Sequence, residues 1–224
     1  MRTKTMTKTD MQLKQDIEEE LRWDPKVNAA QIGVSVDHGT VSLLGSVDTY
    51  AGKRAAEEAT KRVSGVRSVA QDLTVKILAD HKRSDSEVAA SVQSALKSDV
   101  YVPDAVTAKV EQGWVTLEGQ TTWNFQRDAA ERAMCNLVGV IGVSNAIKLK
   151  PQPSVEQVKD KIQAALQRQA TLDTKSIHVD TSDGKVTLTG HASSWQSIED
   201  AANAAWAAPG VTDVIDQVKM SMTF

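Results

Sequence analysis

One sequence motif occurs three times in this chain, and the repetition constrains the fold more than any other feature. Each motif is a glycine, a short β-branched run and a second glycine, at residues 39–45, 113–119 and 184–190. A Gly-Val pair follows every second glycine by 20 residues, and the copies are offset by 74 and then 71 residues. This period is too long for a solenoid repeat and fits a small domain duplicated in tandem.

The repeat predicts the domain organisation. We expect a tail over residues 1–9 and three domains over residues 10–80, 81–150 and 151–224. Units of about 70 residues are only marginally stable alone. The linkers between them are short, and two prolines stiffen the one at residues 150–154.

The hydrophobic pattern within each copy predicts a helix, two strands, a second helix and a last strand. Leu13, Ile17 and Leu21 recur at four-residue spacing, as expected for one face of a helix, and the other copies repeat this spacing. Val41 and Leu43 alternate with polar residues, as expected for a strand. The order αββαβ predicts an α+β fold, in which each copy has two helices on one face of a three-stranded mixed sheet.

Several residues are expected to begin or end these elements. The candidate N-caps of the first helices are Asp10, Ser84 or Asp85, and Ser154. The turns between the first two strands are expected at His38-Gly39, Gln112-Gly113 and Asp183-Gly184, where glycine tolerates positive φ. The second helices are expected to end in a left-handed glycine, at Gly65, Gly139 and Gly210.

Charge and composition exclude several classes of protein. The net charge is −3, and each of the three copies is acidic, so an electrostatic surface for nucleic acid is not expected. No apolar run is long enough to span a bilayer. Residues 1–9 lack the features of a secretory signal, which predicts a cytoplasmic protein, or a periplasmic one if the true N-terminus differs.

The combined motifs resemble the BON domain, a family named for bacterial osmotically inducible and nodulation proteins. The resemblance is carried by the Gly-x-Val-[Ser/Thr]-Leu-x-Gly strand, the alanine-rich second helix and the Gly-Val-x-x-Val ending, in all three copies. It implies the αββαβ fold, no enzymatic activity, and a role in binding phospholipid or attaching to membranes under stress. Better-known relatives are periplasmic or lipid-anchored, whereas neither a signal peptide nor a lipobox cysteine is expected in this chain from its residues 1–9.

The resemblance also directs attention to the first helix, because in some relatives the first helix of one BON unit is implicated in contacting anionic lipid. In the first copy this helix contains Asp16-Ile-Glu-Glu-Glu20, which anionic headgroups would repel. In the third copy the equivalent helix carries Lys159, Lys161 and Arg168 on an amphipathic frame. These three residues are candidate lipid contacts.

Aromatic residues at positions where the sibling copies have lysine are the other candidates. Trp114 takes the position of Lys185, and Trp206 that of Lys61. Three explanations for such residues are open: packing between domains, contact with a ligand or lipid, and ordinary half-exposure. Trp123 and Phe125 lie where the chain enters the second helix, and they would serve as a packing anchor, a membrane interface or a protein contact.

Catalytic and metal sites are not expected. The four histidines share no spacing and Cys135 is the single cysteine, so neither a metal site nor a cofactor is predicted. No nucleophile elbow or phosphate-binding loop occurs. The sequence therefore favours a stress-associated protein that binds anionic phospholipid or envelope components. The alternative is an adapter or chaperone-like module that binds proteins through open sheet faces and tryptophans; a small-ligand or ion sensor has no support from particular residues.

Overall fold

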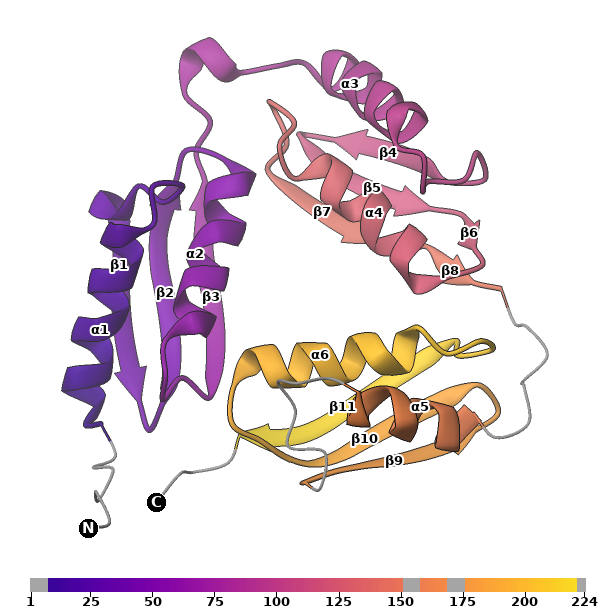
Figure 1. The fold of residues 1–224 in the computed structure, drawn as a ribbon. Coiled ribbons are helices and arrows are strands. Elements are labelled where there is room, and N and C mark those ends of the chain that lie inside the picture. Colours follow the sequence, from indigo (N-terminus) through magenta and orange to yellow (C-terminus); the bar gives the residue numbers. More distant parts are fainter. Residues whose placement is uncertain (1–7, 151–157, 169–175, 221–224) are drawn as a thin grey trace. The chain divides into compact units, whose positions relative to one another are not determined.

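The computed structural model describes residues 8–150, 158–168 and 176–220. Figure 1 shows the repeated units along the chain, each with its helices on one face of a small sheet. The predicted N-cap Ser154 and residues 1–7 of the predicted tail lie outside the described residues. The predicted α+β class is confirmed.

The first repeat has the predicted order of elements. These are α1 (Asp10–Trp23), β1 (Ile32–Asp37), β2 (Thr40–Val47), α2 (Tyr50–Arg62) and β3 (Ser68–Val75), with short 3₁₀ turns at Ala29–Gln31 and Ala79–His81. The central strand is β2, which pairs antiparallel with β1 and parallel with β3. The sheet is therefore mixed, as expected.

The second and third repeats follow the same plan. The second contains α3 (Asp85–Ser98), β4 (Thr107–Glu111), β5 (Trp114–Glu118), β6 (Gln120–Thr121), α4 (Asn124–Met134), β7 (Gly142–Asn145) and β8 (Lys148–Leu149). The third contains α5 (Val158–Gln167), β9 (Ile177–Ser182), β10 (Lys185–Ala192), α6 (Trp195–Trp206) and β11 (Asp213–Met220). In the second repeat the sheet is interrupted, so that β4, β5 and β7 form one part and β6 pairs with β8 beyond it.

Each core lies between the helices and the central strand. In the first repeat the helix residues Leu13, Ile17 and Leu21 are buried against Val41 and Leu43 of β2. The equivalent positions are buried in the other two repeats, except that Val158 in the third repeat is only partly buried. Alanines on the second helix of each repeat lie against the sheet, because a small side chain lets the helix backbone approach closely; Ala56, Ala130 and Ala201 are fully buried.

The first helices are capped one residue earlier than Asp10 and Asp85 would suggest. Thr9 caps α1 and Ser84 caps α3, each in a capping box that a residue three positions later completes, Gln12 or Glu87. The prediction of Asp10 as an N-cap was therefore wrong, because Asp10 is the first residue inside the helix. Ser84, the other predicted alternative in the second repeat, is confirmed.

The turns between the first two strands adopt positive φ at both central residues in every repeat. His38 has φ 50° and Gly39 has φ 79°, and the other two turns match them closely. Positive φ at both positions is the geometry of a type I′ hairpin turn, whose twist suits the flanking strands. The predicted turn positions are confirmed.

The glycines expected to end the second helices lie farther along the chain. α2 ends at Arg62, α4 at Met134 and α6 at Trp206, whereas the glycines are at 65, 139 and 210. All three glycines have positive φ, as predicted, but they shape the turn into the last strand rather than the helix terminus itself. Their predicted role as direct helix ends was wrong.

The second glycine of each motif is required by a close backbone approach. Gly45, Gly119 and Gly190 have φ near 120°, a conformation that side chains rarely adopt. A Cβ atom at these positions would overlap the carbonyl oxygen of the residue that precedes the first strand of the repeat: Gln31, Ala105 or Ser176. Both the φ angle and the overlap exclude a side chain.

We predict that Gly45→Ala lowers the unfolding free energy of the first repeat by about 2–4 kcal/mol, since it adds backbone strain and a steric overlap. Urea denaturation of the full chain, followed by circular dichroism, measures the loss. Gly33→Ala is the matched control, because Gly33 lies on β1 and a Cβ there meets nothing closer than 3.7 Å. Equal effects of the two substitutions would contradict the explanation.

Candidate functional site

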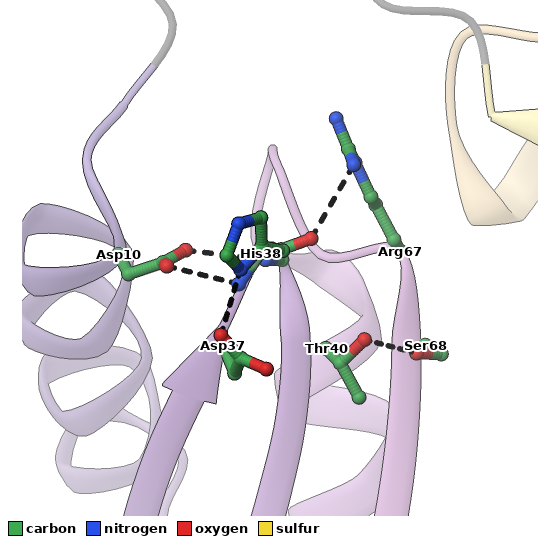
Figure 2. A network of polar contacts seen from close by, with 7 residues as sticks. Asp10, Asp37, His38, Thr40, Arg67 and Ser68 are labelled. Atoms are coloured by element: carbon green, nitrogen blue, oxygen red, sulfur yellow. Dashed lines mark hydrogen bonds and ion pairs between the residues drawn. The ribbon is translucent and has the colours of Figure 1, made fainter.

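An aspartate at the start of the first helix holds the hairpin turn in two repeats. Figure 2 shows the two oxygens of Asp10 accepting hydrogen bonds from the backbone N–H groups of His38 and Gly39, at 2.9 and 3.1 Å. Asp85 accepts the same pair of bonds from Gln112 and Gly113 in the second repeat. The repetition of the contact indicates a structural clamp between helix and turn.

Asp10, Asp37 and His38 also form the grouping of possible metal ligands found within residues 8–150, 158–168 and 176–220. Their ligand atoms lie within 4.8 Å of one another. The Asp10 oxygens are already engaged by the turn, and the side chains of Asp37 and His38 are almost fully exposed. Asp10 also stands at a helix N-terminus, where the helix dipole disfavours a cation. We therefore interpret this cluster as part of the clamp.

The acidic surroundings raise the pKa of His38 above its ordinary value. The main cause is the 2.7 Å hydrogen bond between His38 Nδ1 and Asp37, and the charge of Asp10 adds to it. We predict that Asp37→Asn moves the pKa of His38 back toward its ordinary value, and proton NMR of the histidine ring over a pH titration measures it. A pKa that does not change in this variant would show that the ring does not hold the hydrogen bond in solution.

Trp114 lies on the open face of the second sheet, as the alternation of β5 predicts. The side chain is 45% exposed, and its Nε1 donates a hydrogen bond to Ser144 Oγ at 2.9 Å. Its ring covers Gly142, the residue that faces it on β7, so closely that a Cβ on this glycine would overlap the ring carbons. The sequence did not reveal that Trp114 packs within its own repeat.

The same cross-strand position holds a matched pair in every repeat. Thr40 faces Ser68, whose hydroxyl donates to Thr40 at 3.1 Å (Figure 2), and Lys185 faces Asp213. The pairs are thus two hydroxyls, a tryptophan over a glycine, and a cation opposite an anion. A directly opposed pair of this kind is a unit of sheet stability.

We predict that Gly142→Ser destabilises the full chain by about 1–3 kcal/mol, because the new side chain displaces the Trp114 ring. The double variant Trp114→Thr with Gly142→Ser restores the pair found in the first repeat and recovers most of the loss. Thermal unfolding measures both variants. Additive losses in the double variant would contradict this pairing.

The candidate cations of the third repeat do not form one surface. Lys161 and Arg168 are exposed, and Arg168 directly follows the last residue of α5, seven residues after Lys161. Lys159 is about 200° around the helix from Lys161 and forms an ion pair with Asp180 of β9 at 3.1 Å. Lys161 and Arg168 are therefore the pair best placed to attract an anion.

The apolar side of α5 is not available to a membrane. Ile162 and Leu166 are almost completely buried in the core of the third repeat. The amphipathic pattern that suggested membrane insertion thus reflects packing within the repeat. Contact of this helix with lipid would be electrostatic.

The acidic stretch on α1 is partly neutralised. Asp16 pairs with Lys8, and Glu20 accepts hydrogen bonds from Arg62. Arg62 also binds Asp24 at 2.8 Å, and this hydrogen bond lowers the pKa of the Asp24 carboxyl below its ordinary value. The repulsion that this helix would exert on anionic headgroups is therefore smaller than its sequence suggests.

The remaining aromatic candidates occupy different surroundings. Phe125, in the first turn of α4, is 49% exposed, and Trp123 just before it is half-buried. Trp206 is half-buried and packs against the core of its own repeat. Whether Trp206 also packs against another domain or a ligand stays a prediction.

Sequence reasoning missed a set of exposed apolar side chains at the C-terminal end of the first helix. Trp23, the last residue of α1, is 84% exposed. Val100 and Tyr101, directly after α3, are 88% and 58% exposed. The sequence contains one signal for them, which is that they follow the last buried apolar residue of the first helix. Beyond that residue the chain is no longer packed against the core. We call Trp23, Val100 and Tyr101 the helix-end residues.

None of the described helices is long and apolar enough to cross a membrane.

Comparisons with known proteins found a similar curated protein, similar solved structures and a matching family model. A similar curated protein is osmotically-inducible protein Y of Escherichia coli (strain K12), 29% identical over 129 residues, which are 55% of this chain and 64% of that protein. The matched part is therefore slightly less than two thirds of that relative's length. Two solved structures of CdsD, a structural protein of the type III secretion system of Chlamydia trachomatis, are also similar. One is 16% identical with a TM-score of 0.26 and covers 92% of this chain and 91% of its own. The other, the C-terminal domain, is 15% identical with a TM-score of 0.26 and covers 96% and 100%.

The family model of the BON domain matches three segments, at residues 9–77, 84–151 and 154–222. These segments coincide with the three glycine motifs and with the αββαβ units, and together they take up most of the chain. The chain therefore belongs to the BON domain family, and it carries three tandem copies of that domain.

Proposed function

We propose that this protein is a non-enzymatic, osmotic-stress-associated protein that binds membrane surfaces containing anionic phospholipid. The observation that carries the proposal is the exposure of the helix-end residues at the same end of the first and second repeats. A contiguous exposed apolar surface marks an interaction site more strongly than a single exposed side chain does, and Val100 and Tyr101 are adjacent in the chain. Tryptophan and tyrosine are the residues that favour the boundary between lipid and water.

Charge supports a membrane rather than a purely apolar partner. Lys26 lies three residues after Trp23, and Lys97 lies three residues before Val100. An apolar end beside a lysine combines insertion with attraction to anionic headgroups. Lys161 and Arg168 would add a peripheral electrostatic contact in the third repeat. The osmotic-stress association rests on the family and on the name of the relative from Escherichia coli.

Vesicle flotation of the full chain tests the proposal. We predict that the protein floats with vesicles of phosphatidylcholine mixed with phosphatidylglycerol, and that Trp23→Ser with Tyr101→Ser reduces this binding because the inserted groups are lost. Lys161→Gln with Arg168→Gln should weaken binding to the anionic vesicles about 30-fold, at about 1 kcal/mol for each basic residue.

Lys159→Gln is the matched control, because Lys159 lies on another side of α5 and is already paired with Asp180. It should leave flotation almost unchanged. A wild-type chain that does not float at low salt contradicts the proposal, as does equal flotation of all variants.

A further inference from the structure

A groove of about 510 Å³ lies in the second repeat between α3 and β4. One wall is α3, the other is β4, and the loop between them closes one end. The lining is mainly apolar, with Ala89, Val92, Leu96, Val102, Val106 and Ala108 as its principal residues. All of these residues belong to a single repeat.

The groove exists because two side chains are smaller than those of the sibling repeats. Ala108 is exposed, whereas the equivalent residues Val34 and Val179 are only 7% and 1% exposed. Ala89, on α3, takes the position of Lys14 in α1 and of Lys159 in α5. At both positions the first and third repeats have a larger side chain than the second repeat.

The strand that forms one wall also has an open edge. β4 is the outer strand of its sheet, and among the strands that the structure describes it pairs with β5 alone. The carbonyl of Leu117 on β5 accepts a hydrogen bond from the backbone N–H of Ala146, on the side of β5 that faces away from β4. Backbone groups of successive residues point to opposite sides of a strand, so those of Thr116 and Glu118 face β4.

This pairing fixes which groups of β4 face outward. Thr116 is opposite Lys109, and Glu118 is opposite Thr107. Ala108 and Val110 therefore direct their backbone N–H and C=O groups away from β5, to the edge of the sheet. Their side chains lie on the helix side of the sheet, as does that of the buried Val106.

The charge of the groove suits an uncharged occupant. Its lining includes one cation and one anion, Lys97 and Asp104. A polyanion such as nucleic acid or an anionic lipid surface would gain nothing from such a lining. Backbone amides that need hydrogen-bond partners, between apolar side chains, match the groove better.

We propose that this groove binds an extended aliphatic segment of a partner protein, which adds to β4 as a further strand. Addition of a strand to an exposed sheet edge is a recurring mode of peptide recognition, in which the backbone supplies affinity and alternate side chains enter pockets. Here Ala108 and Val110 would pair with the added backbone, and one aliphatic side chain of the segment would lie between α3 and β4. This interaction does not depend on membrane binding.

Amide hydrogen exchange of the full chain tests the pairing directly. The probes are end-blocked heptapeptides in which valine, leucine or isoleucine alternates with threonine. A binding peptide should slow exchange at Ala108 and Val110 by at least about tenfold, and leave Thr107 and Lys109 unchanged because they already bond to β5. The same peptide N-methylated at every residue cannot donate backbone hydrogen bonds at either edge, so it should lose this effect. No protection by any peptide of the set would overturn the proposal.

Substitutions taken from the sibling repeats separate binding from folding. Ala108→Val and Ala89→Lys should each abolish peptide binding without lowering the unfolding midpoint, since the siblings fold with these residues. Lys109→Ser, which installs the residue of the first repeat on the opposite side of β4, is the control and should bind normally. Unchanged peptide binding in both filled-groove variants would overturn the proposal. Self-association that Ala108→Val abolishes, with no peptide binding, would overturn it in favour of a second copy of the chain.

Discussion

The structure of each repeat depends on one close contact between backbone atoms, in which the carbonyl before the first strand approaches the second glycine of the motif. This contact closes one end of a hairpin whose other end is the type I′ turn. The register of the first two strands is fixed between these two points, from the pair Asp37–Thr40 to the pair Ile32–Gly45 in the first repeat. A register that cannot shift keeps every apolar residue of the central strand on the helix side.

A fixed register lets the open face of the sheet vary as long as both members of a pair vary together. Thr40 with Ser68, Trp114 with Gly142, and Lys185 with Asp213 are three solutions at one position. Trp114 is thus explained by its partner, which weakens the hypothesis that it is an adapter surface. The groove beside α3 differs, because Ala89 and Ala108 are both smaller than their siblings and the space beside them stays open. This open volume is the better indication of a binding site.

The fold could be predicted from the sequence because its determinants are local and repeated three times. Glycine pairs, alternation along strands and four-residue spacing along helices act within a few residues of one another, and each copy confirms the others. What the sequence could not show concerns mainly partners that lie far apart in the chain. Asp10 is a residue type that commonly caps helices, but its carboxylate oxygens accept hydrogen bonds from a turn 28 residues away. Lys159 has the sequence of a lipid contact, but Asp180 pairs with it. The groove is a space that small side chains leave unfilled, and it becomes visible only when α3 is packed against β4.

The packing of the first helices also decides how these repeats can use their surfaces. Ile17, Val92 and Ile162 are each buried in the core of their own repeat, so no first helix has a free apolar face. A repeat of about 70 residues cannot release such a face without losing much of its core, because its stability is already marginal. Any contact with lipid or protein must therefore use surfaces that the core does not bury, namely the ends of helices and the edges of sheets. The second repeat has both, because its helix-end residues project from α3 while β4 leaves its outer backbone groups open.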